Sequence, residues 1–384
     1  MTPGRVSTAG PRAVAAVLCW RRVSDAQRAP GQTETPDAGL RRYLESCREV
    51  VLDEIRRMLP EPSRYRSILY DRMLEYPLRE AKALRPALCM ATCRALGGTL
   101  DSVRRSAASL ELYHNAFLIH DDIEDASLLR RGKPTLHRMY GTPIALNVGD
   151  AMLALALQPL LDNVETVGLG AALRILEVIA RMARETAEGQ ALELDWIRNR
   201  DWSVLDQDYV EMVERKTGWY SFIAPVEIGA IAAGHDPARL PALRGFARSL
   251  AIAFQIQDDV LNLEPDVGGY GKEASGDLWE GKRTLVVLHM MRTATAGERA
   301  EAERILALPR PPGEAPGPVK TEGDIRTLLD LIDRHRSIDH ARRAARAWIE
   351  EASYHFDAAS AWLAPSIHRD FLATLLGYVL DRAR

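Results

Sequence analysis

Residues 111–125 read ELYHNAFLIHDDIED, an apolar stretch of helical period that ends in a cluster of carboxylates. On a helix, Asp121 and Asp125 share one face a turn apart, and Asp122 lies about 100° around the axis. Carboxylates at this spacing repel one another unless a cation lies between them, and an oxygen-only ligand set favours Mg²⁺. The pattern therefore predicts a metal-binding helix end. A solvated acidic helix end is the alternative for one such motif taken alone.

A second acidic cluster lies about 140 residues further along. Residues 250–263 read LAIAFQIQDDVLNL, so Asp258 and Asp259 again follow an apolar stretch, with Asn262 one turn beyond Asp258. Two sets with this spacing indicate facing walls that hold metal ions between them. A metal-bridged diphosphate is the natural occupant, because Mg²⁺ neutralises a diphosphate and makes it a better leaving group.

Basic side chains surround the two clusters, as recognition of a diphosphate requires. Arg130 and Arg131 directly follow the first cluster, ahead of Gly132. A guanidinium binds phosphate oxygens in a forked geometry, although at a helix end a basic C-terminal cap is the alternative. The further basic candidates, each of which is on its own compatible with an ordinary surface charge, are Lys82, Arg85, Lys216, Lys272 and Lys282.

Most of the remaining chain has the same helical period, with Pro or Gly between the segments. We predict an all-α fold, a single domain of ten or more helices over residues 39–384, preceded by a disordered Pro/Gly/Ser/Thr/Arg-rich tail at 1–38 and interrupted by a Pro/Gly-rich surface loop at 308–324. After a first helix from Leu40, helices are predicted at 103–129, 143–164, 170–191, 206–233, 240–263, 283–308, 323–335, 338–362 and 368–382.

Composition limits the classes of partner. Charged residues make up 27% of the chain and the formal net charge is −3, so no basic field points to nucleic acid. The four cysteines have neither the density nor the spacing of a disulfide scaffold or a zinc site, which indicates a reducing compartment. Residues 13–20 are too short an apolar core for a typical secretory signal, and no other apolar run reaches the roughly 20 residues of a membrane span. We therefore expect a cytoplasmic protein without a membrane span.

The motifs, taken in order, resemble those of the trans-isoprenyl diphosphate synthases, or polyprenyl synthetases. The resemblance runs from about residue 78 to about residue 290. It rests on K-x-x-R-P at 82–86, E-x-x-H at 111–114, HDDIED with LRRGKPT from 120, NVGD at 147–150, GQ at 189–190, KT at 216–217, FQIQDD at 254–259, GK at 271–272 and DLWEGKRT at 277–284. It implies an isoprenoid synthase-type helical bundle around a deep central cavity, a homodimer, and three Mg²⁺ ions.

The resemblance also implies roles for single residues. Metal binding would fall to Asp121, Asp122, Asp125, Asp258 and Asp259, with Asn262 as a neutral oxygen ligand where many relatives have a carboxylate. The allylic diphosphate would be bound by Arg130, Lys216 and Lys272, with Lys282 as a further substrate-binding residue, and isopentenyl diphosphate by Lys82, Arg85, His114 and Arg131. Thr217 and Gln255 would stabilise the developing allylic cation through their oxygen dipoles. Glu80 and Ala81 depart from the family pattern, which often has Gly-Gly there.

Product length is inferred from the residues before the first acidic cluster. Some farnesyl-forming relatives have an aromatic residue where this chain has Ala116, so growth past fifteen carbons is expected. Phe117 and Tyr113 would then stop it near twenty, and the implied product is geranylgeranyl diphosphate, although both rings are also compatible with ordinary core packing. The alternatives are farnesyl or longer products, a class I terpene cyclase, and a non-catalytic regulatory subunit. The cradle for isopentenyl diphosphate argues against a cyclase, and the retained aspartates argue against a regulatory subunit.

Overall fold

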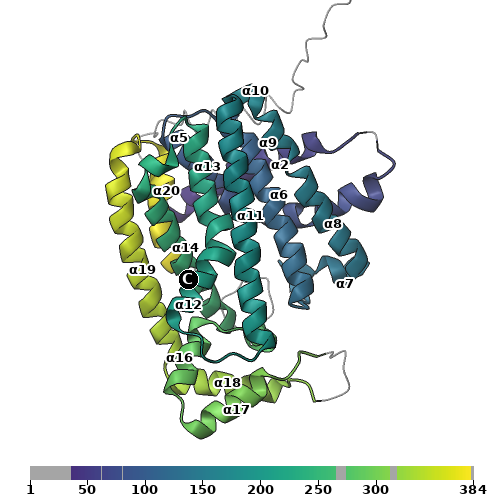
Figure 1. The fold of residues 1–384 in the computed structure, drawn as a ribbon, viewed down its shortest axis with the longest axis vertical. Helices are drawn as coiled ribbons and strands as arrows, with labels where there is room; N and C mark the ends of the chain where they lie inside the picture. Colours follow the sequence, from purple (N-terminus) through teal and green to yellow (C-terminus); the bar gives the residue numbers. More distant parts are fainter. Residues whose placement is uncertain (1–35, 62, 80, 265–273, 312–317, 382–384) are drawn as a thin grey trace, which may run out of the picture.

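The computed structural model describes residues 36–61, 63–79, 81–264, 274–311 and 318–381. Almost all of this part of the chain is helical, and the long helices stand side by side along the vertical axis of Figure 1. The predicted all-α fold is confirmed. The tail predicted at 1–38 lies outside the described residues up to position 35, and the first helix begins at Pro36, four residues before the predicted start.

The elements follow one another closely along the chain. The N-terminal half contains α2 (Pro36–Met58), η1 (Arg66–Tyr70), α3 (Asp71–Met73), α4 (Glu75–Leu78), α5 (Leu84–Ala95), α6 (Leu100–Glu124), β1 (Leu129–Arg130), β2 (Lys133–Pro134), α7 (Leu136–Tyr140), α8 (Thr142–Leu155), α9 (Gln158–Asp162), α10 (Val164–Val167) and α11 (Leu169–Arg198). The C-terminal half contains α12 (Asp206–Val213), η2 (Glu214–Ile223), α13 (Ala224–Ala232), η3 (Pro237–Arg239), α14 (Pro241–Leu263), α15 (Gly276–Glu280), α16 (Leu285–Thr293), α17 (Ala296–Leu306), α18 (Glu322–Arg334), α19 (Ser337–Ala359), η4 (Ser360–Trp362) and α20 (Ile367–Asp381).

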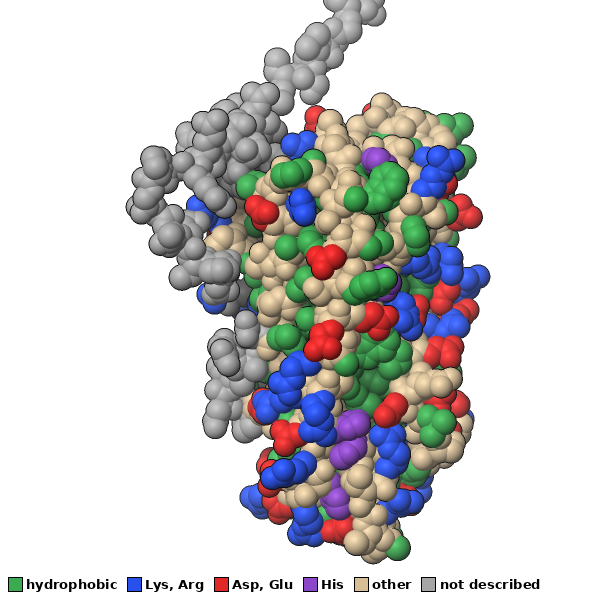
Figure 2. Space-filling view, turned by 90° about the vertical axis from the view of Figure 1, so that its left-hand side faces the viewer, with side chains coloured by type: hydrophobic (Ala, Val, Ile, Leu, Met, Phe, Trp, Pro, Cys, Tyr) green, Lys and Arg blue, Asp and Glu red, His purple; other side chains and the backbone are tan. Residues whose placement is uncertain are grey.

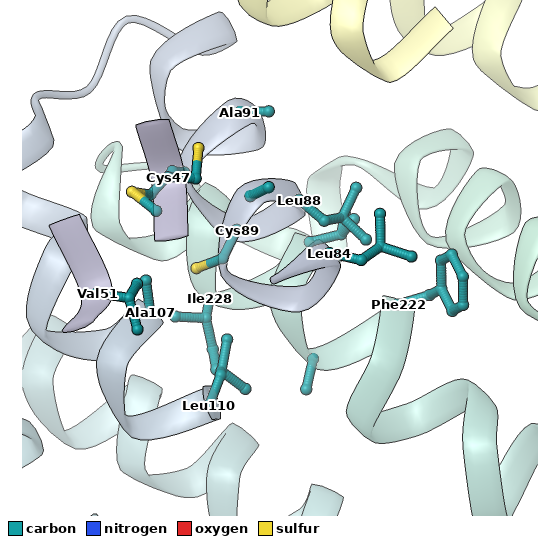
Figure 3. Close-up of a cluster of buried hydrophobic side chains, with 14 of the residues drawn as sticks. Cys47, Val51, Leu84, Leu88, Cys89, Ala91, Ala107, Leu110, Phe222 and Ile228 are labelled. Atoms are coloured by element: carbon teal, nitrogen blue, oxygen red, sulfur yellow. The ribbon is translucent and has the colours of Figure 1, made fainter. Parts of the chain in front are cut away.

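The main core lies where α2, α5, α6 and α13 meet (Figure 3). Cys47 of α2 and Cys89 of α5 are completely buried there beside aliphatic side chains such as Leu110 and Ile228. Cys93, one turn after Cys89, is equally buried. Both cysteines of α5 thus behave as small apolar residues. The close packing of α5 and α6 fixes the two helices that carry much of the candidate site.

The helix that carries the first acidic cluster is shorter than predicted. It starts at a capping box formed by Thr99 and Ser102 and ends at Glu124, not at residue 129. Beyond it, the chain turns back as a two-residue hairpin in which Arg130 pairs with Lys133. Arg131 and Gly132 form the turn with φ of 53° and 71°, as a tight hairpin of this type requires. The alternative for these arginines, a basic cap at a helix end, is therefore excluded, because both belong to a hairpin.

A second core lies towards the C-terminal end of the chain. There, α14 packs along α19, and α17 and α18 form the lower end seen in Figure 1, below α16. The chain leaves α17 at Leu306 and re-enters a helix at Glu322, as the Pro/Gly-rich composition of 308–324 predicts, and residues 312–317 lie outside the described part. On the face that α19 presents in Figure 2, basic side chains are interleaved with acidic ones.

One helical stretch departs from the expected hydropathy. Among the described residues, Thr142–Val167 alone is long and apolar enough to cross a membrane, with a mean hydropathy of 1.6. The prediction that no apolar run approaches this length is corrected. The stretch is divided into α8, α9 and α10, and α8 and α9 pack against α6. Buried helices of globular proteins meet the same criterion, so length and hydropathy do not assign this stretch to a membrane.

Candidate active site

A cavity of about 1280 Å³ opens between α5, α6, α11, η2 and α14. It exceeds the usual size of a pocket for one small ligand, so it has room for two substrates. Most of the residues predicted from the sequence line it: Lys82, Arg85, Tyr113, His114, Phe117, Asp121, Arg130, Arg131, Lys216, Thr217, Gln255, Asp258, Asp259 and Lys282. Ala116, Asp122, Asp125 and Asn262 are not part of the lining, and Lys272 lies outside the described residues.

The carboxylates at the end of α6 have different surroundings. Asp121 lines the cavity, where Lys216 Nζ lies 3.4 Å from its Oδ1 and an Arg130 nitrogen 3.4 Å from its Oδ2. Asp122 is fully buried, and it accepts hydrogen bonds from the Arg130 guanidinium and from the Tyr76 hydroxyl at 2.6 Å. Asp121 therefore faces the cavity, whereas Asp122 holds the hairpin against α6.

Asp125 is joined to a lysine from a distant segment. Lys282 Nζ lies 2.6 Å from Asp125 and 2.7 Å from Glu280. Burial lowers the pKa of Lys282, but the Asp125 and Glu280 carboxylates raise it by more, so its pKa lies well above the ordinary value. Lys282 is thus a permanent positive charge between the first acidic cluster and α15.

The second acidic cluster is held by a chain of hydrogen bonds. Thr217 donates to Gln255 at 2.9 Å, and the Gln255 amide donates to Asp259 at 2.8 Å. Tyr209 donates to the other Asp259 oxygen at 2.7 Å. Asn262 points elsewhere: its side-chain oxygen accepts the backbone N–H of Asp277 at 3.1 Å, and the residue is buried. This geometry gives Asn262 a structural partner and does not support its prediction as a metal ligand.

Lys216 and Thr217 lie on η2, a π-helical segment between α12 and α13. The sequence predicted one regular helix here, and π-helical segments inside helices are common at functional sites. Gly189 of α11 makes the arrangement possible, because a Cβ there would meet the Lys216 backbone nitrogen and lie 2.7 Å from its Cα. Only a glycine lets the two helices approach this closely.

The ammonium group of Lys216 lies between two carboxylates. It donates to Glu193 of α11 and also lies near Asp121. Burial lowers the pKa of Lys216, but Glu193 and Asp121 raise it by more, so the pKa lies above the ordinary value. Lys216 therefore remains charged at every physiological pH, as binding of a phosphate group requires.

The other end of the cavity is basic. Arg85 donates to His114 at 3.1 Å and to Ser221 at 2.8 Å, and its guanidinium lies 4.6 Å above the centre of the Tyr220 ring. Burial and the neighbouring Arg85 hold the pKa of His114 well below the ordinary value, so the imidazole is neutral at pH 7. Lys82 donates to the Tyr378 hydroxyl of α20 at 2.8 Å. This end can bind an anion of its own, apart from the acidic end.

The acidic end has the chemistry of a divalent cation site. Burial raises the pKa of Asp125, and the Asp121 charge adds to this effect. Burial and then the Asp277 and Asp258 charges raise the pKa of Asp259. Lys216, Arg130 and Lys282 offset part of the charge of these carboxylates. The described donor set is built of carboxylate oxygens, which suit Mg²⁺ or Ca²⁺. The residue types therefore fit a divalent cation, although among the described residues no three acidic, histidine or cysteine side chains already converge on one point.

Comparisons with known proteins agree with this geometry. The sequence model of the polyprenyl synthetase family matches residues 67–315. This chain belongs to the polyprenyl synthetase family. It is 33% identical to geranylgeranyl diphosphate synthase of Methanosarcina mazei, over 78% of this chain and 86% of that protein. It is also 33% identical to geranylfarnesyl diphosphate synthase of Aeropyrum pernix, over 83% of this chain and 97% of that protein.

Solved structures extend the likeness to the fold. Polyprenyl synthase of Caulobacter crescentus, solved with calcium and isoprenyl diphosphate, superposes with a TM-score of 0.76 at 29% identity, over 92% of this chain and all of that one. The chain is thus a prenyltransferase with the all-α fold of the isoprenyl diphosphate synthases.

Several residues of this prenyltransferase site escaped the sequence argument. Glu193 was overlooked although it lies one turn after the Gly189–Gln190 pair, where an acid on the same helix face is a usable signal. Tyr76 and Tyr209 gave no signal, because a tyrosine that bonds a distant aspartate looks like any core aromatic. Tyr378 was equally invisible, since it reaches Lys82 across 296 positions of sequence.

The residues predicted to set chain length are divided by the structure. Phe117 lines the cavity one turn before Asp121, and Tyr113 lines it one turn earlier. Their ring centres lie 5.9 Å apart, and Phe117 also meets the Tyr220 ring edge-on at 5.7 Å. Ala116 is completely buried and does not line the cavity. In this prenyltransferase the size of the cavity along α6 therefore depends on the two aromatic rings directly and on Ala116 only through packing.

Proposed function

We propose that the chain condenses isopentenyl diphosphate head-to-tail with an allylic diphosphate and releases a linear trans-prenyl diphosphate, with geranylgeranyl diphosphate as the main product. The observation that carries the proposal is the division of one cavity into two ends. One end is acidic and contains the permanently charged Lys216, and the other is basic and surrounds the neutral His114. Such a cavity accepts two diphosphates, one through metal ions and one through direct ion pairs.

The acidic end would hold the allylic diphosphate. Asp121, Asp258 and Asp259 line the cavity and are the first candidates for Mg²⁺ ligands, and Asp125 lies outside the lining, paired with Lys282. Bound Mg²⁺, three ions in the family pattern, would supply Lewis-acid stabilisation of the leaving diphosphate. Lys216 and Arg130 would bind its oxygens, and Lys282, which follows α15, adds a further positive charge.

The middle of the cavity would stabilise the positive charge on the allylic carbon. The Thr217 hydroxyl donates its hydrogen bond to Gln255, so the lone pairs of the hydroxyl oxygen are available to the cavity that Thr217 lines. An oxygen dipole held in this way stabilises a developing cation without being able to attack it as an anion would. Gln255 in turn is oriented by its bond to Asp259.

The basic end would bind isopentenyl diphosphate. Lys82, Arg85 and Arg131 supply the charges, and His114 accepts a hydrogen bond from Arg85, which orients the guanidinium. Once the new carbon–carbon bond forms, a proton must leave the carbon next to it. The departed diphosphate, which lies at the acidic end, is the base within reach of both substrates.

Chain length would be set where the growing hydrocarbon meets Phe117 and Tyr113. The two rings are in contact with each other and stand on the α6 face that leads away from Asp121. A small residue in place of Phe117 would open the cavity towards Leu118 and Leu153, which also line it. We therefore expect twenty carbons from the native chain and longer products after truncation of this ring.

We also propose a homodimer in the cytoplasm. Consecutive elements from α8 to the start of α11 expose a set of large apolar side chains: Leu146, Leu157, Leu161, Val164, Leu169 and Leu173. A patch of this kind on a protein surface usually marks an interface. A second copy placed on it in two-fold symmetry would cover the apolar stretch Thr142–Val167 and account for its hydropathy.

The deciding experiment is product chromatography after incubation with Mg²⁺, isopentenyl diphosphate and, in turn, the five-, ten- and fifteen-carbon allylic diphosphates. A linear twenty-carbon diphosphate is the expected product. A cyclic hydrocarbon, or product formation without isopentenyl diphosphate, would contradict the proposal. Asp121→Ala and Asp258→Ala should each lower turnover by orders of magnitude with unchanged helical content, and near-normal prenyl transfer by both would exclude this site.

A further inference from the structure

The two acidic pairs share a feature that neither motif predicts. In each pair, the second aspartate accepts a hydrogen bond from the hydroxyl of a buried tyrosine on another element. Tyr76 of α4 donates to Asp122 at 2.6 Å, and Tyr209 of α12 donates to Asp259 at 2.7 Å. Each tyrosine is only 1% exposed. Two unrelated segments, 133 positions apart, therefore each donate a tyrosine hydrogen bond to the second carboxylate of an acidic pair.

We propose that Tyr76 and Tyr209 are paired positioning residues, each of which fixes the second carboxylate of one acidic pair so that the first carboxylate faces the metal-bridged diphosphate. The proposal rests on the function proposed above. Consecutive helical residues point about 100° apart, so a fixed second aspartate also fixes the helix rotation that presents the first. Asp121 and Asp258 are the first members, and both line the cavity; Asp122 does not, whereas Asp259 lines it beside Asp258.

The contacts of Tyr76 fix the direction in which its hydroxyl group donates a hydrogen bond. The hydroxyl oxygen accepts the Leu136 backbone N–H at 3.0 Å, which directs the proton to Asp122. The Arg79 guanidinium lies 4.6 Å above the ring centre, and Arg131 donates to the Tyr76 backbone oxygen at 2.8 Å. Arg131 lines the cavity, so Tyr76 also joins the first acidic pair to the basic end.

The two tyrosines act on carboxylates of different charge balance. Asp122 is also paired with Arg130, so its negative charge is compensated and both its oxygens are engaged. Asp259 receives its two described side-chain hydrogen bonds from neutral groups, Tyr209 and Gln255. A neutral donor fixes the direction of a carboxylate without cancelling its charge. Tyr209 thus fixes the direction of Asp259 without supplying a compensating charge, whereas Tyr76 holds a carboxylate that is already paired with Arg130.

The test compares Tyr76→Phe and Tyr209→Phe with Tyr43→Phe. Phenylalanine keeps the ring and removes only the hydroxyl. Tyr43 is the matched control, because it is also buried and also makes one hydroxyl bond, to His368 at 2.8 Å, away from the cavity. Calorimetric titration with inorganic diphosphate at fixed Mg²⁺, together with the Mg²⁺ concentration that half-activates turnover, measures the acidic end directly.

Removal of a residue that orients a metal ligand typically weakens metal binding 10- to 100-fold. We therefore expect at least about tenfold weaker Mg²⁺–diphosphate binding in both Tyr76→Phe and Tyr209→Phe, with a matching rise in the half-activating Mg²⁺ concentration, and no change in Tyr43→Phe. Binding within twofold of wild type in Tyr76→Phe and Tyr209→Phe, or an equal loss in Tyr43→Phe, would overturn the proposal. Wild-type protein that does not bind Mg²⁺–diphosphate would instead overturn the proposed function.

A double-mutant cycle separates action through the aspartate from a general effect. Tyr209→Phe combined with Asp259→Asn should be no worse than Asp259→Asn alone, because the tyrosine has then lost the group through which it acts. Additive losses would show that Tyr209 acts by another route and would refute the positioning role. Tyr209 decides the question by itself if Tyr76→Phe does not give folded protein by circular dichroism.

Discussion

Gly189→Ala should be among the most damaging single-methyl changes in the chain. The added Cβ would meet the Lys216 backbone nitrogen and lie 2.7 Å from its Cα and 2.8 Å from the Arg215 Cβ, where ordinary contacts begin at 3.4 Å. Because backbone cannot rotate away as a side chain can, α11 and η2 must separate by about 1 Å. Overpacking of this size costs about 1–3 kcal/mol of folding free energy.

The effect on activity should exceed the effect on stability. Lys216 bonds Glu193 of the same α11 and lies near Asp121, so a shift of η2 moves the ammonium away from the diphosphate oxygens it would bind. A misplacement of about 1 Å can cost about 10²-fold in rate. We expect kcat/KM to fall by about that factor at temperatures where the variant is folded.

The assay is steady-state prenyl transfer paired with urea unfolding of the same preparation. Gly297→Ala is the control, because Gly297 lies in α17 with nothing within 4 Å of its added Cβ. It should leave activity unchanged and stabilise the protein by a few tenths to about 1 kcal/mol through the unfolded chain. Folded Gly189→Ala protein with kcat/KM within twofold of wild type would refute the claim that this close approach positions Lys216.

Four further changes test other parts of the molecule. Glu193→Gln should lower kcat/KM by about 10²-fold. It should also shift the alkaline limb of the pH profile of kcat/KM to lower pH, because the Glu193 carboxylate raises the pKa of Lys216. An alkaline limb that does not move would argue against the pairing of Glu193 with Lys216. Phe117→Ala should lengthen the product seen by chromatography, and an unchanged length would refute its role as a stop. Leu161→Glu places a charge on α9 at a position that is 60% exposed. If the exposed apolar face from α8 to α11 is the dimer interface, light scattering should show a monomer. An intact dimer would place the interface elsewhere. Burial and the neighbouring Arg94 lower the pKa of His368 to about 4, so the neutral imidazole stabilises the fold fully above pH 6.5 and this stabilisation is lost as the pH falls. At pH 5 the loss in unfolding free energy is about 2 kcal/mol. Urea unfolding at pH 7 and pH 5 should show this loss in the wild type and not in His368→Gln.

Much of the candidate site could be predicted from sequence because its chemistry is local. Asp121 and Asp125 are one helical turn apart, so their shared face follows from helix geometry alone. The helical period likewise predicted several long helices within a few residues of their observed ends, namely α14, α18, α19 and α20. It did not predict α5, it ended α11 seven residues early, and it merged α16 with α17. It was also wrong where the chain makes a local exception: the hairpin at Arg130 to Lys133 ends a helix early, and the π-helical η2 replaces a regular helix.

Long-range contacts could not be predicted in this way. Tyr76 and Asp122 lie 46 positions apart, and Thr217 and Gln255 lie 38 apart, so their partnership exists only after the helices have packed. The same holds for Asn262, which looked like a metal ligand from its spacing until the structure showed its oxygen on the Asp277 N–H. The residue type indicates which groups a side chain can bind, but the partners that packing brings near determine which of them it does bind.

The sequence by itself determined the helical class, the two acidic helix ends and the family, because these depend on period, spacing and ordered motifs that a linear chain displays in full. The tertiary structure decided that Asp122 is buried away from the cavity whereas Asp121, Asp258 and Asp259 line it, because these positions depend on how the helices pack. It also decided the charge of Lys216 and the neutrality of His114, since burial and neighbouring charges set a pKa and neither is written in the order of residues.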